Sequence, residues 1–73
     1  MAEYNMNYMN LRKRLLTLKI VTESDMNLIE SSQKSRLLLI DGLLKDLDNR
    51  YSENQPLSVI ECQVDVVENE IKK

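Results

Sequence analysis

The chain has 73 residues, ten Lys and Arg against twelve Asp and Glu, a net charge of −2, one cysteine and no histidine. A chain this short buries only about 60% of its unfolded surface, so it forms one domain at most and gains from a stabilising partner. The composition excludes an internal disulfide and a structural zinc site, and the acidic balance is not that of a typical nucleic-acid binder.

The N-terminal segment MAEYNMNYMN lacks the apolar core and cleavage pattern of a signal peptide. No stretch approaches the about 20 apolar residues of a membrane span. We therefore expect a cytoplasmic protein with no membrane span. The basic cluster of Arg12, Lys13, Arg14 and Lys19 is typical of a solvated helix face, so nucleic acid is not the expected partner.

A first helix is predicted over about residues 4–20. Its apolar residues are spaced by four, three, four and three positions, which places them on one side of a helix: Tyr4, Tyr8, Leu11, Leu15 and Leu18. The β-branched pair at 20–21 and the polar run at 22–25 predict a break there, since Thr, Ser and Asp favour helix caps over helix interiors.

A second helix is predicted over about residues 25–51. One side of it carries Met26, Ile29, Gln33, Leu37, Ile40, Leu44, Leu47 and Tyr51. The turn residues SENQP end it, because Pro56 cannot continue a helix. The pairs Asp41 with Lys45 and Asp46 with Arg50 have the four-residue spacing of helical ion pairs.

The third segment has two interpretations. IECQVDV alternates apolar and polar residues, as a strand over residues 59–66 would, but helical spacing also relates Leu57, Ile60, Val64, Val67 and Ile71. Ser58 and Glu61 fit a capping box, and a lone strand would have no sheet to join. We therefore predict a helix over about residues 58–72 and a single all-α domain over 1–73, either a helical hairpin or a three-helix layer that associates with a partner or itself.

Each predicted helix also carries apolar residues on a second side. In RLLLIDGLLKDL, residues 36–47, the four aliphatic residues 37–40 alone cover about 300° of the helix circumference. The small Gly42 within this segment favours close approach of another backbone. The predicted partner-binding residues are Met9, Leu16, Ile20, Leu28, Ser32, Ser35, Leu39, Gly42, Val59, Cys62 and Val66. The alternative is an irregular monomer that buries these second sides itself.

No catalytic signature is present, and without histidine the usual proton shuttle near neutral pH is missing. We expect neither an enzyme nor a cofactor or metal site. Cys62 stands between apolar neighbours and is interpreted as a small interface or core residue.

Residues 26–73, with the long helix LIESSQKSRLLLIDGLLKDLDNRY, the turn SENQP and a shorter apolar helix, resemble the small co-chaperones of type III secretion needle subunits in size, acidity and layout. That resemblance implies a helical hairpin that docks on a tetratricopeptide-type chaperone and helps to keep a needle subunit from polymerising in the cytoplasm. It also implies a hairpin seam formed by Leu37, Ile40, Leu44 and Leu47 with Ile60, Val64 and Val67.

Two other functions stay open. A small regulatory protein would bind a transcription factor or nucleic acid through the basic cluster. A self-assembling structural protein would use its second apolar sides to form a homo-oligomer.

Overall fold

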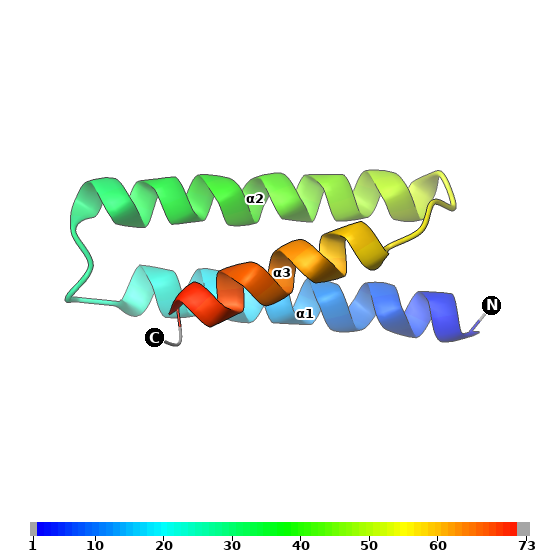
Figure 1. Ribbon diagram of the computed structural model, residues 1–73, viewed down its shortest axis with the longest axis horizontal. Coiled ribbons are helices and arrows are strands. Elements are labelled where there is room, and N and C mark those ends of the chain that lie inside the picture. The colour runs from blue at the N-terminus through cyan, green and yellow to red at the C-terminus, as the bar shows by residue number, and fades with distance from the viewer. Residues whose placement is uncertain (1, 72–73) are drawn as a thin grey trace.

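A computed structural model describes residues 2–71, which form three α-helices: α1 (Ala2–Ser24), α2 (Glu30–Ser52) and α3 (Ser58–Ile71) (Figure 1). No strand occurs among these residues, so the all-α prediction is confirmed and the alternative of a strand over 59–66 is wrong. A helix is favoured here because its three- and four-residue spacing places Ile60, Val64 and Val67 on one side of α3, where all three are buried. Residue 72, the predicted end of this helix, lies outside the described residues.

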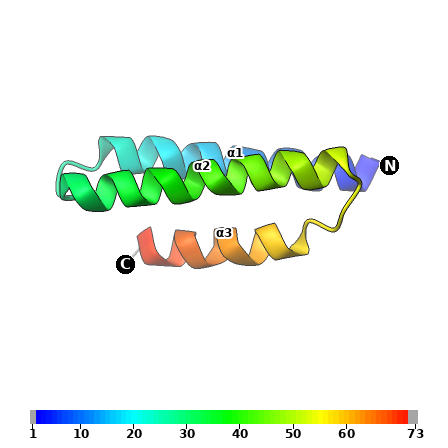
Figure 2. The same ribbon diagram turned by 90° about the horizontal axis from the view of Figure 1, so that it is seen from above.

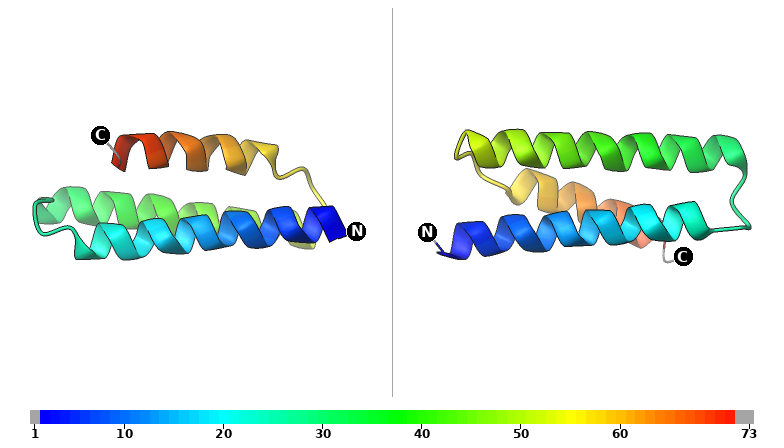
Figure 3. Two further views of the ribbon diagram at one scale, coloured as in Figure 1. Left: turned by 90° about the horizontal axis from the view of Figure 1, so that it is seen from below. Right: turned by 180° about the vertical axis from the view of Figure 1, so that it is seen from behind.

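The helices are arranged as an antiparallel hairpin with a third helix across it. Figure 1 shows α1 and α2 side by side and α3 crossing them diagonally, from the end of α2 towards α1. Seen from above, α3 forms a separate layer over one face of the hairpin (Figure 2), and the views from below and behind agree (Figure 3). All three pairs of helices are in contact, most extensively α1 and α2. The first helix therefore belongs to the bundle.

The connection between α1 and α2 lies later than the sequence predicted. α1 continues through Thr22 to Ser24, and α2 begins at Glu30. The side-chain amide of Gln33 donates hydrogen bonds to the carbonyl oxygens of Thr22 and Glu23, at 3.1 and 3.2 Å. The last carbonyls of a helix lack the usual N–H donor four residues on, and this amide donates to two of them, so it stabilises a longer α1.

The residues between the two helices form a turn. Asp25 accepts a hydrogen bond from the backbone N–H of Asn27 at 3.0 Å, the pattern of an Asx turn. Met26 is 97% exposed and Ile29 is also exposed, so neither joins the buried side of α2. The prediction of a helix from about residue 25 was wrong because it extended the apolar spacing into this turn.

The predicted turn at residues 52–56 is confirmed. The N–H of Gln55 donates to the carbonyl of Arg50 at 2.8 Å and that of Asn54 to Tyr51 at 3.2 Å, with Asn54 in the left-handed conformation at φ 60°. This pattern is a Schellman motif, in which asparagine is one of the residues that tolerate positive φ. The first backbone hydrogen bond of α3 runs from Glu61 to Leu57, so Leu57 occupies the N-cap position that the capping box assigned to Ser58.

All three helices contribute to the core. Its buried residues are Leu11, Leu15, Leu18, Ile40, Leu43, Leu47, Leu57, Ile60, Val64 and Val67. Leu43 was not assigned to the buried side of the second helix, whereas Leu37 and Leu44 of the implied seam are only half-buried. The buried side is rotated relative to the prediction because α2 packs against both α1 and α3 rather than against one partner helix.

The three tyrosines join the N-terminal half of α1 to the C-terminal end of α2. The ring of Tyr51 stacks against those of Tyr8 and Tyr4, with centroid distances of 4.0 and 5.4 Å. The hydroxyl of Tyr4 donates to the carbonyl of Gln55 at 2.7 Å, which is the better of two acceptors in reach of its single proton. These contacts fix the register of the hairpin at this end.

Tyr8 gives a pH-dependent prediction. Its pKa is raised above 10.0 because its hydroxyl donates to Asp48 at 2.6 Å, with further contributions from burial and from the negative charge of Asp48. A raised folded-state pKa stabilises the fold below pH 10, and this contribution is lost as the pH rises through the folded-state value. Asp48→Asn should lower the pKa of Tyr8, measured by NMR titration of its ring. Asp46→Asn, on the same helix, is the control, and an unchanged Tyr8 titration in Asp48→Asn would contradict the assignment.

Thr22 gives a prediction for stability. Its side chain is only 1% exposed, and its hydroxyl has no hydrogen-bond partner among the described residues. Thr22→Val removes a buried polar group at nearly constant volume and should stabilise the protein by about 1 kcal/mol. The measurement is the urea midpoint at constant slope. Thr17→Val is the control, since Thr17 is exposed and bonds the carbonyl of Lys13 at 2.9 Å. An equal midpoint shift in both variants would show that burial is not the cause.

Candidate protein-interaction surfaces

None of the eleven predicted partner-binding residues is buried: Leu28 and Ser32 are half-buried and the other nine are exposed. They do not form one surface. One group lies on α1, a second lines a groove between α2 and α3, and a third lies around the start of α2. The sequence placed these residues outside the core but could not tell which of them share a face.

The second group lines an apolar groove, here called the α2–α3 groove, with a volume of about 320 Å³. Its lining residues are Leu39, Leu43, Cys62, Gln63, Val66 and Val67. Leu43 and Val67 belong to the core, whereas Leu39 and Val66 are 48% and 58% exposed. Gln63 is the one polar residue among the six. The groove therefore joins the core to an exposed apolar surface.

Two of the predicted residues lie beside this groove. Val59 is exposed on α3, one helical turn before Cys62. Gly42 is exposed on α2, one turn after Leu39, and a Cβ atom built on it would have no neighbour within 4 Å. No atom of residues 2–71 fills this space, so the close approach of another backbone that the sequence favours at Gly42 stays a prediction about a partner.

The first group, here called the α1 row, consists of Met9, Leu16 and Ile20. All three are exposed, Ile20 to 65%. At 100° per residue they lie opposite the buried side of α1, so they face away from α2 and α3. A shallow hollow of about 290 Å³ runs along them, and Arg12 and Lys13 also line it. The α1 row and the α2–α3 groove are thus on different faces of the bundle.

The third group, Leu28, Ser32 and Ser35, lines a small open hollow together with Ser31 and Arg36. Sequence reasoning missed Leu38, which is 74% exposed on the outer side of α2. It also missed that Leu43 and Val67 form the base of the groove. The position of Leu43 one turn after Leu39 could have indicated this contact.

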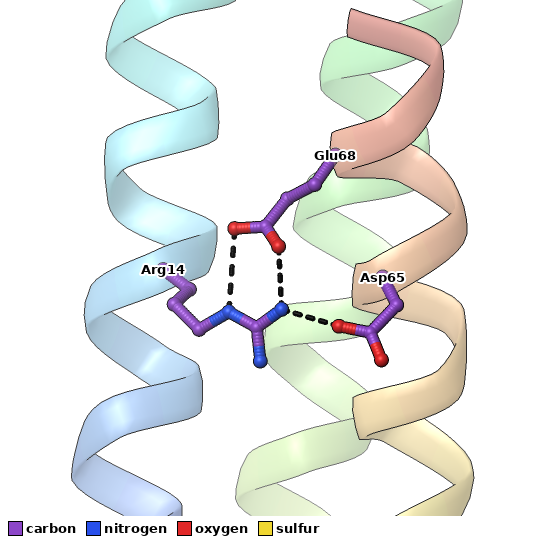
Figure 4. Close-up of polar contacts among 3 residues, drawn as sticks. All are labelled: Arg14, Asp65 and Glu68. Carbon is purple, nitrogen blue, oxygen red and sulfur yellow. Dashed lines mark hydrogen bonds and ion pairs between the residues drawn. The ribbon is translucent and has the colours of Figure 1, made fainter. Parts of the chain in front are cut away.

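Arg14 dominates the electrostatics between α1 and α3. Its guanidinium donates through two nitrogens to the carboxylate of Glu68 and also bonds Asp65 at 2.5 Å (Figure 4). The bonds to Glu68 and then to Asp65 raise the pKa of Arg14. Lys19 forms an ion pair with Asp41 of α2 at 3.3 Å, in place of the predicted pair of Asp41 with Lys45.

These pairs divide the predicted basic cluster. Arg14 and Lys19 bind acidic residues of the neighbouring helices, whereas Arg12 and Lys13 form no ion pair with any residue that the structure describes. The predicted pair of Asp46 with Arg50 is present, at 3.6 Å. Two cations therefore remain beside the α1 row.

Within residues 2–71 no group of three or more Cys, Asp and Glu side chains is placed to hold a metal ion. No helix in the same range is both long and apolar enough to cross a membrane. No protein-family model, curated protein or solved structure matches this chain.

Proposed function

We propose that this chain is a non-catalytic protein-interaction module whose α2–α3 groove receives an apolar helix of another protein. The observation that carries the proposal is the groove itself, where exposed Leu39 and Val66 flank the core residues Leu43 and Val67. Each aliphatic side chain that a partner covers completely contributes about 1.5–3 kcal/mol. Leu39 and Val66 are already partly covered, so a partner that covers them completely adds only part of this burial free energy to binding.

The more specific proposal is a cytoplasmic co-chaperone of a type III secretion needle subunit. It is supported by the acidic composition and by the resemblance of residues 26–73 in helical layout. The bundle departs from a simple hairpin because Leu11, Leu15 and Leu18 of α1 complete its core. In this proposal α1 covers one face of the two C-terminal helices, and the groove is the part left for the needle subunit or its tetratricopeptide-type chaperone.

The test is groove-dependent capture of such a partner. The tagged chain is expressed in the cells that produce it naturally, and the proteins that copurify are identified by mass spectrometry. Leu39→Glu and Val66→Glu each place a carboxylate in the apolar groove and should remove the partner. Leu38→Glu is the matched control, because it makes the same change at the adjacent exposed residue, which does not line the groove.

The co-chaperone proposal expects a needle subunit or its chaperone in the fraction lost with Leu39→Glu and retained with Leu38→Glu. A different helical partner with the same dependence would support the interaction module and reject the co-chaperone. Copurifying proteins that do not change between these variants would reject the groove as the binding site.

A further inference from the structure

We propose that the α2–α3 groove also receives the α1 row of a second copy of this chain, so that copies associate head to tail. This inference rests on the proposed function in one respect, that the groove binds an apolar helix face. The α1 row and the groove are on different faces, so one chain can use both at once. A second copy can therefore place its α1 row in the groove of the first copy while its own groove stays free.

The row is shorter than the helix that forms one wall of the groove. The α1 row runs from Met9 to Ile20, about 16 Å at 1.5 Å per residue. α3, which forms one wall of the groove, has 14 residues and is about 21 Å long by the same measure. The row can therefore lie along α3 without extending beyond it, with part of the row in the groove against Leu39 and Val66.

Charge favours this pairing. Residues 9–20 carry four basic residues and no acidic one, whereas α3 carries four acidic residues and no basic one. Within one chain, Arg14 already neutralises two of those acids. Arg12 and Lys13 beside the row, and Glu70 on the groove side of α3, form no ion pair with other described residues, whereas Glu61 lies on the α1-facing side of α3. A second copy brings the remaining cations to the acidic helix.

The same charges disfavour the two-fold alternative. Pairing groove to groove would bring two acidic α3 helices together, including Glu70, which lies one turn beyond Val66. Head-to-tail pairing joins unlike surfaces, so each added copy leaves a row and a groove free. Such an interface forms an open chain or a closed ring rather than stopping at a symmetric dimer.

The test uses light scattering of the purified full-length chain up to about 1 mM, where weak self-association is detected. The wild type should exceed the monomer mass of 8.6 kDa and return towards it as salt is added. Ile20→Glu in the row and Val66→Glu in the groove should each weaken association at least about tenfold. Leu38→Glu is the control and should associate like the wild type.

Mixing the two single variants provides the decisive comparison. The intact groove of Ile20→Glu should bind the intact row of Val66→Glu, giving a species of twice 8.6 kDa that does not grow further. Circular dichroism checks that each variant keeps its helicity. If Ile20→Glu loses helicity, Met9→Glu is used in its place. If Val66→Glu loses helicity, Leu39→Glu is used in its place.

A wild type that stays at 8.6 kDa at every concentration overturns the inference. So does a mixture that remains monomeric, or a row variant that self-associates like the wild type, since the latter indicates groove-to-groove pairing. These failures are separate from failure of the proposed function. A monomeric chain that still captures a partner through Leu39 rejects head-to-tail association alone, whereas a self-associating chain without groove-dependent capture rejects the proposed function alone.

Discussion

Replacing Leu47 by alanine is expected to lower the free energy of unfolding by about 2–5 kcal/mol, because Leu47 is fully buried among the three helices and its truncation leaves a cavity. Domains have stabilities of about 0.05–0.15 kcal/mol per residue, so a chain of this length has roughly 4–11 kcal/mol in total. The substitution should therefore remove a large part of the stability. Urea unfolding followed by circular dichroism measures the change.

Leu38→Ala is the matched control for Leu47→Ala. It makes the same change on the same helix at a residue that is 74% exposed, and should alter stability by no more than about 0.5 kcal/mol. Similar losses in the two variants would mean that Leu38 is covered in the monomer, and that the assignment of the buried side of α2 is wrong.

Two valines of α3 give the second prediction. Val64→Glu buries an unpaired charge at a fully buried position and should unfold the chain, since such changes are among the most destabilising single substitutions. Val66→Glu places the same charge two residues away at an exposed position, and should leave helicity and the thermal midpoint nearly unchanged. Circular dichroism of both variants measures helicity and the midpoint.

The pair separates the core from the interaction surface on one helix. If Val66→Glu unfolds the chain, Val66 belongs to the core and does not form an exposed wall of the α2–α3 groove. A folded Val64→Glu variant would show that α3 is dispensable for the packing of α1 and α2. Either result would contradict the proposed division of α3 into a buried and a partner-binding side.

The helices could be predicted from sequence because three- and four-residue spacing of aliphatic residues needs no tertiary information. Leu11, Leu15 and Leu18 of α1 and Ile60, Val64 and Val67 of α3 were assigned to the buried side and are buried. The turn before α3 was also predictable, because Pro56 and the polar residues before it stop a helix locally.

The start of α2 was not predictable in this way. Gln33 bonds carbonyls ten and eleven residues earlier, and this contact exists only once α1 and α2 are antiparallel. Leu43 was missed for a related reason. The buried side of α2 faces the space between α1 and α3, and the spacing of apolar residues within α2 does not show where those two helices lie.

The candidate surfaces were predictable residue by residue but not as surfaces. Apolar residues opposite a buried side are expected to be exposed, and Met9, Leu39 and Val66 are. Which of them meet depends on the diagonal course of α3 across the hairpin (Figure 1). Cys62 and Val66 line one groove with Leu39, whereas Met9 lines a separate hollow. That course follows from long-range packing and from the bonds of Arg14 to Glu68 and Asp65.

The central claim, that the α2–α3 groove is covered by a partner in the cell, is tested most directly by the alkylation rate of Cys62. This residue is the only cysteine of the chain, it is exposed, and it lines the groove. A small permeant maleimide should modify it at least about fivefold more slowly in the cells that produce the chain than in dilute purified protein, because a bound partner protects it in proportion to occupancy. Leu39→Glu should restore the fast rate. Equal rates in the cell and in dilute solution, or protection that persists in Leu39→Glu, would contradict the claim.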